Sequence, residues 1–104
     1  MSITNATLNT GAAAAVYTSS GSSAMTTAYL CNRTSSPVTV NVFVVASGAV
    51  ASQTTNMIYS NLVIAGDDTY ILESERILLD NGDFIAGNAS ITNAVVATVI
   101  HTGI

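Results

Sequence analysis

The side chains best suited to chemistry in this 104-residue sequence are its six acids, which all lie between Asp67 and Asp83. Asp80 and Asp83 flank Asn81-Gly82 and resemble part of a calcium-binding loop. Calcium takes about six to eight oxygen ligands, and a calcium-binding hand also needs a bidentate Glu downstream and flanking helices. The sequence supplies neither, so it favours a turn with solvated carboxylates. Asp80 and Asp83 are weak metal candidates, to which Asp67 and Asp68 would add ligands from a neighbouring loop.

Nucleophilic catalysis has one candidate pair, because His101 and Cys31 are the only His and Cys in the chain. A Cys–His dyad is formally available. His101 lies on a predicted strand near the end of the sequence, and Cys31 belongs to an alternating strand, so we predict structural roles for both.

Two other kinds of active site also lack their components. Glycoside hydrolysis would need paired carboxylates in a cleft, and here the acids lie in turns and Trp is absent. No glycine-rich loop precedes a helix that could hold a phosphate. The sequence therefore predicts a protein that is not an enzyme and uses no cofactor.

The basic side chains are sparse, because the chain has no Lys and only two Arg. Arg76 follows Glu73 and Glu75, and these three are either an ion pair between subunits or a solvated strand edge. The planar guanidinium of Arg suits bidentate pairing with interface carboxylates. Arg33 lies in a predicted turn, where it is a surface or contact residue. The interface candidates are therefore Arg33, Glu73, Glu75 and Arg76.

The charge balance excludes several classes of partner. A net charge of −4 and a pI near 4.2 argue against nucleic acids and anionic membranes, since phosphate binding depends on clusters of Lys and Arg. No apolar run reaches the ~18 residues of a membrane span. The N-terminal residues have neither the basic region nor the apolar core of a signal peptide, so no signal peptide is predicted.

The elements that position these side chains read as short strands separated by turn signals. Val38–Ala46 is the strongest, since Val alternates along it and its second half is apolar on both faces. Asn81-Gly82 between two short apolar runs predicts a tight β-hairpin. The predicted strands are Ile3–Leu8, Ala12–Thr18, Ala24–Asn32, Val38–Ala46, Asn56–Ile64, Thr69–Leu72, Ile77–Leu79, Phe84–Ala86 and Ile91–His101.

This pattern predicts an all-β fold: a single antiparallel β-sandwich domain over residues 1–104, with about eight strands. Jelly-roll and immunoglobulin-like topologies both fit, and a small barrel is the runner-up. Exposed sheet edges are normally protected by Lys, Pro or bulges. With no Lys and one Pro in the chain, neighbouring copies or another protein are expected to cover the edges, so a homo-oligomer is predicted.

Nearly the whole chain resembles the small β-sandwich virion proteins of tailed bacteriophages, especially cyanophages. The resemblance consists of strand and turn motifs rather than of catalytic residues. The motifs are Val16-Tyr17 before a Ser/Gly loop, Leu30-Cys31-Asn32, Val38–Val45 with Ser47-Gly48, Ile58-Tyr59, Ala65–Tyr70, Ile77–Ile85 and Ala94–Val99.

The resemblance implies a structural protein of the virion that has no enzymatic activity and is synthesised in the cytoplasm of the host cell. The preferred interpretation is a capsid decoration, or cement, protein on the exterior of the shell that binds the major capsid protein and bridges capsomers. The alternative is a neck, tail or fibre-attachment component that binds other virion proteins. A host-surface or glycan-binding module is a further alternative, although the long loops 19–23 and 47–55 contain no aromatic or acidic residue for sugar contacts.

Overall fold

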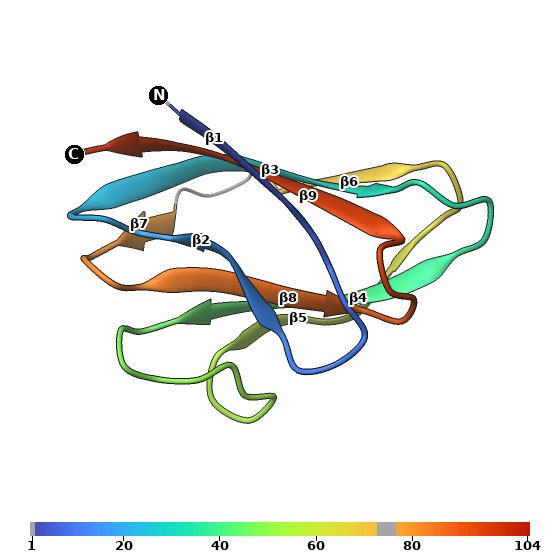
Figure 1. Ribbon diagram of the computed structural model, residues 1–104, viewed down its shortest axis with the longest axis horizontal. Coiled ribbons are helices and arrows are strands. Elements are labelled where there is room, and N and C mark those ends of the chain that lie inside the picture. The colour runs from blue at the N-terminus through green and yellow to red at the C-terminus, as the bar shows by residue number, and fades with distance from the viewer. Residues whose placement is uncertain (1, 73–76) are drawn as a thin grey trace.

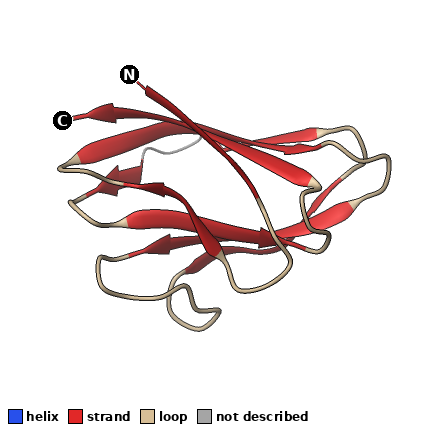
Figure 2. Cartoon of the chain, viewed as in Figure 1, coloured by secondary structure: helices blue, strands red, loops and turns tan. Residues whose placement is uncertain are grey.

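The computed structural model describes residues 2–72 and 77–104, and every regular element within these residues is a strand (Figure 2). The predicted strand positions are confirmed to within a few residues at each end. The strands are β1 (Ser2–Thr7), β2 (Ala14–Thr18), β3 (Ser23–Asn32), β4 (Val38–Val45), β5 (Met57–Ile64), β6 (Thr69–Leu72), β7 (Ile77–Leu79), β8 (Phe84–Ala89) and β9 (Val95–Gly103).

The strands form two antiparallel sheets that pack face to face (Figure 1). Sheet A has the order β1-β9-β3-β6, and β7 also pairs with β3. Sheet B has the order β2-β8-β4-β5. The described strands therefore form a sandwich with open edges, as predicted, and not the closed barrel that was the runner-up.

The pairing is that of a jelly roll. β6 and β7 pair with successive parts of β3, so together they form one edge of sheet A. If β6 and β7 are treated as one strand, the strands pair as β1 with β9, β2 with β8, β3 with β6–β7, and β4 with β5. Successive pairs alternate between the two sheets, which is the wrapping of a jelly roll. The order favours the jelly roll over the immunoglobulin-like alternative.

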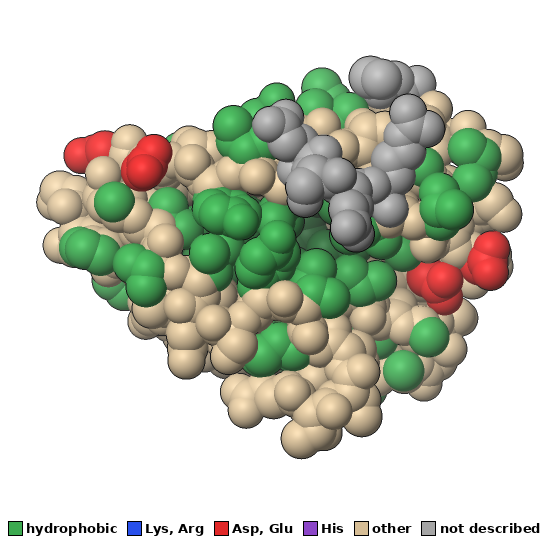
Figure 3. Space-filling view, turned by 180° about the vertical axis from the view of Figure 1, so that it is seen from behind, with side chains coloured by type: hydrophobic (Ala, Val, Ile, Leu, Met, Phe, Trp, Pro, Cys, Tyr) green, Lys and Arg blue, Asp and Glu red, His purple; other side chains and the backbone are tan. Residues whose placement is uncertain are grey.

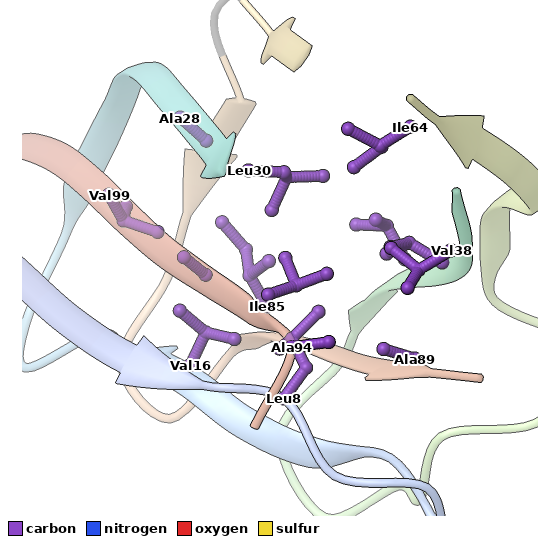
Figure 4. Close-up of a cluster of buried hydrophobic side chains, with 14 of the residues drawn as sticks. Leu8, Val16, Ala28, Leu30, Val38, Ile64, Ile85, Ala89, Ala94 and Val99 are labelled. Atoms are coloured by element: carbon purple, nitrogen blue, oxygen red, sulfur yellow. The ribbon is translucent and has the colours of Figure 1, made fainter. Parts of the chain in front are cut away.

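The core lies between the sheets, where small and β-branched side chains from both converge (Figure 4). Val38, Val40 and Val42 alternate into it from β4, while Val95, Ala97 and Val99 enter from β9. A bulge between Met25 and Thr27 shifts the register of β3. Met25 therefore joins Ala28 and Leu30 in the core, although simple alternation places it on the opposite face.

The predicted hairpin at Asn81-Gly82 is wrong. The amide of Asp83 donates to the carbonyl of Asp80 at 3.1 Å, and Gly82 has a φ of +88°. Positive φ at only the second central residue defines a type II turn, whereas a tight hairpin favours a primed turn. β7 pairs with β3 in sheet A and β8 with β2 and β4 in sheet B. The turn therefore carries the chain from one sheet to the other.

Candidate assembly surfaces

The turn that contains Asp80 and Asp83 is held by its own carboxylate. One oxygen of Asp83 accepts from the amide of Ser47 and the other from the amide of Asp80, both at 2.9 Å. The side-chain oxygen of Asn81 accepts from the amide of Gly21 at 2.9 Å. A carboxylate whose two oxygens both accept backbone N–H groups is a structural clamp, so Asp83 stabilises the contact between the loops.

The acids at Asp67 and Asp68 lie at the other end of the sandwich. Thr69 pairs with Cys31 at one end of β3, and Leu79 pairs with Ser23 at the other. The eight intervening steps along β3 separate the two acidic turns by roughly 26 Å. Figure 3 shows acidic side chains at both ends of the molecule, with hydrophobic side chains between them. Asp67 and Asp68 therefore cannot complete a calcium site with Asp80 and Asp83, which corrects that expectation.

Within residues 2–72 and 77–104, no three or more His, Cys, Asp or Glu side chains are grouped so that they could hold a metal ion. Three of the predicted interface residues, Glu73, Glu75 and Arg76, lie outside these described ranges. The fourth, Arg33, is exposed, and its Nε donates to the carbonyl of Asn93 at 2.6 Å. That bond ties Arg33 to the turn before β9, and its role at an interface stays a prediction.

His101 and Cys31 lie far apart. His101 pairs with Met25, six residues along β3 from Cys31, which corresponds to roughly 20 Å. The ring of His101 stacks on Tyr17 at 3.8 Å between centroids, and its Nε2 lies 2.9 Å from Oγ1 of Thr4. His101 therefore links β9 to β1 and to β2 of the opposite sheet. No sequence pattern indicates this stack, because it depends on how the two sheets face each other.

A buried hydroxyl pair lies beside this stack, and sequence analysis did not detect it. Ser19 and Ser23 are both buried, and their Oγ atoms are 2.6 Å apart. The Tyr17 hydroxyl donates to Oγ of Ser23 at 3.0 Å. Every buried side-chain N or O atom in the described part of the chain has a hydrogen-bond partner, so these hydroxyls have partners within the fold.

The outer face of sheet A is the larger feature that the sequence did not reveal. Alternation places the core side chains of β9 and β3 inward and the intervening ones outward. The pairing then sets these outward residues in rows across three or four strands. The rows are Ile3–Ile100–Thr27, Asn5–Thr98–Tyr29–Ile71 and Thr7–Val96–Cys31–Thr69.

None of the side chains in these rows carries a charge. Ile3 is 65% exposed and Ile71 46%, and the rows that contain them also contain Thr, Asn and Tyr side chains. Such a face combines apolar contact area with hydroxyl and amide groups that can hydrogen-bond, and its burial would leave no unpaired charge. The outer face of sheet A is therefore chemically suited to contact another protein.

The outer face of sheet B is different, because loop residues cover the part formed by β4 and β8, while Val63 of β5 is exposed. Phe43, Val45 and Ala86 point away from the main core and form a small buried cluster with Ala51 and neighbouring side chains. Beside this cluster is an open hollow of about 380 Å³. It is lined by Ala12, Ala13, Phe43, Val50, Ala51, Gln53 and Asn88.

Comparisons of this chain with protein families, with curated proteins and with solved structures return no match. Within the described residues, no helix has the length and apolar character needed to cross a membrane.

Proposed function

We propose that this chain is a non-enzymatic structural protein of a tailed-phage virion, most specifically a capsid decoration protein on the exterior of the shell. The observation that carries the proposal is the outer face of sheet A, where none of the described side chains in its rows carries a charge. Apolar side chains such as Ile3 and Ile71 are exposed on it between hydroxyl and amide groups. The resemblance of the sequence indicates which kind of assembly would use such a face.

In this role, the outer face of sheet A binds the major capsid protein and spans the junction between capsomers. Many copies then stabilise the shell by mass action, because each copy binds the assembled state and not the separated capsomers. Uncharged contacts are only weakly screened by salt. Binding to the shell is therefore expected to persist at high ionic strength.

The test is co-sedimentation of the purified protein with undecorated shells of the phage that encodes it. Tyr29→Lys places a charge in the centre of the outer face of sheet A and is expected to abolish co-sedimentation. Ser60→Lys adds the same charge at an exposed position of β5 in sheet B, and is expected to sediment like the wild type. Equal binding by both variants would contradict the assignment of this face.

A neck, tail or fibre-attachment role would use the same surface with a different virion partner. Binding of the purified protein to tails but not to shells would distinguish this role. The host-surface or glycan-binding alternative is favoured by one observation, the hollow of about 380 Å³ over sheet B, a volume within the ~300–1,000 Å³ of ligand pockets. Gln53 offers an exposed amide there. Binding on a glycan array that is lost in Gln53→Ala would support this alternative.

A further inference from the structure

The four edges of the two sheets are not equally protected. An unprotected edge strand presents free backbone N–H and C=O groups to other chains, and bulges, short strands or interruptions normally prevent such pairing. β2 has a register shift between Ala15 and Tyr17. β5 has register shifts against β4, and Asn61 within it has a φ of +52°. The edge opposite β1 in sheet A is divided between two short strands, β6 and β7.

β1 has none of these protections. Its six residues pair with β9 without a register shift, and none of them has a positive φ. It contains no charged residue and no Pro. It is the last strand of sheet A, so within residues 2–72 and 77–104 no other strand pairs with its free side. In Figure 1 it lies at the front of the molecule, with β9 behind it.

The hydrogen bonds of Leu8, the residue that follows β1, show which backbone groups of β1 point away from β9. Leu8 donates to the carbonyl of Val95 and accepts from the amide of Asn93, both at 3.0 Å, so its backbone groups face β9. In an antiparallel pair these directions alternate along the strand. The N–H and C=O groups of Ile3, Asn5 and Thr7 therefore point away from β9, while their side chains lie on the outer face of sheet A.

From these directions we propose that β1 pairs antiparallel with β1 of a second copy of this chain, across a two-fold axis at Asn5. In this register Asn5 lies opposite Asn5 of the second copy, and Ile3 lies opposite Thr7. Each of these pairs exchanges two backbone hydrogen bonds, so all the free groups of Ile3, Asn5 and Thr7 are used. A shift by two residues would leave either Thr7 or Ile3, depending on its direction, without a partner in β1 of the second copy.

The side chains support a second copy as the occupant. A two-fold axis places the residue at its centre opposite itself, and like charges there would repel. Asn5 is neutral, and its Nδ2 already donates to Oγ1 of Thr98 at 3.1 Å. The pairing joins two copies of sheet A into one continuous sheet, which doubles the uncharged outer face. Its use on a shell rests on the proposed function, but the pairing itself does not.

The first test measures the mass of the isolated protein by sedimentation velocity over a range of concentrations. The wild type is expected to reach twice its monomer mass of 10.6 kDa. Asn5→Pro removes a free N–H and no bond to β9, so it is expected to keep the fold and remain a monomer. Asn5→Ala retains the N–H and is expected to form the dimer. A monomeric wild type, or an Asn5→Pro dimer, would overturn the proposal.

The second test determines the register by cross-linking in a Cys31→Ser background. Directly opposite residues that exchange hydrogen bonds have Cα atoms about 5.5 Å apart, within the range of a disulfide. Asn5→Cys is expected to give a disulfide-linked dimer under mild oxidation, whereas Ile3→Cys alone is not. Ile3→Cys mixed with Thr7→Cys is expected to cross-link. Efficient linkage by Ile3→Cys alone would overturn the register, and none of these outcomes depends on binding to a shell.

Discussion

Asn32 offers the sharpest test of how the fold is held together, because this fully buried side chain connects three segments. Its Nδ2 lies 2.8 Å from the carbonyl oxygen of Ser36, 3.1 Å from that of Ile64 and 3.2 Å from that of Ala65. Its Oδ1 accepts from the amide and the hydroxyl of Thr34 at 3.0 and 2.8 Å. Asn32 thus fixes two loops to the end of β3.

The cost of Asn32→Ala follows from these contacts. The carbonyl of Ile64 makes its bond to Asn32 in a buried position, and a buried acceptor without a partner costs about 1–3 kcal/mol. The other bonds are partly buried, so water replaces them in part and each contributes about 0.5 kcal/mol or slightly more. We expect the free energy of unfolding to fall by about 3–5 kcal/mol, against a typical total of ~5–15 kcal/mol.

Urea denaturation of the purified variant measures this loss. Asn5→Ala serves as the matched control, because Asn5 is exposed and its side chain makes one cross-strand bond. It is expected to change stability by no more than about 0.5 kcal/mol. All variants are compared at one concentration low enough to keep the wild type monomeric. A loss below about 1 kcal/mol for Asn32→Ala would refute the reasoning.

Asn32→Asp is expected to make the free energy of unfolding depend on pH in a direction that the surroundings of the side chain determine. The carboxylate would be buried and would face three carbonyl oxygens, which raises its pKa above that of the unfolded chain. A raised folded pKa contributes stability at low pH and loses it as pH rises. Relative to wild type, Asn32→Asp is therefore expected to be least stable at neutral pH and to recover on acidification. A difference that does not vary with pH would contradict the buried environment of Asn32.

Two further predictions concern loops. A Cβ on Gly66 would overlap the backbone carbonyl of Ser35, whereas a Cβ on Gly11 would meet nothing within 4 Å. Gly66→Ala is therefore expected to lower the thermal midpoint by several degrees, and Gly11→Ala is expected to leave it nearly unchanged. Equal midpoints for the two variants would refute the close packing of these loops. Because Asp83 uses both carboxylate oxygens for backbone amides, EDTA is expected to leave the melting temperature unchanged. A lower midpoint with EDTA that calcium restores would reinstate the metal site.

Strand positions were predictable because they are local. The alternating Val residues of β4 and the turn signals between strands can be recognised in the sequence, and the structure confirms the strand positions that they predict. The partner of each strand is not local. Asn81-Gly82 favours a turn, and the structure has one, but a dipeptide does not determine whether the next strand returns to the same sheet. The hairpin prediction failed for this reason.

The candidate site shows the same limit. Asp67 and Asp68 are close in sequence to Asp80 and Asp83, but β6 and β7 run along β3 and separate the two pairs to opposite ends of the molecule. Residues as distant as Asn5, Thr98 and Tyr29 instead form one row. Similarly, the bulge that turns Met25 inward has no signal in residue type. Only the three-dimensional pairing brings the uncharged outer face of sheet A together.

The measurement that most directly tests the central claim is the copy number of this chain in purified virions, by quantitative mass spectrometry. A decoration protein predicts many copies, in a simple whole-number ratio to the major capsid protein. A few copies would place the chain in the neck or tail and contradict shell decoration. No copies would contradict the virion role altogether.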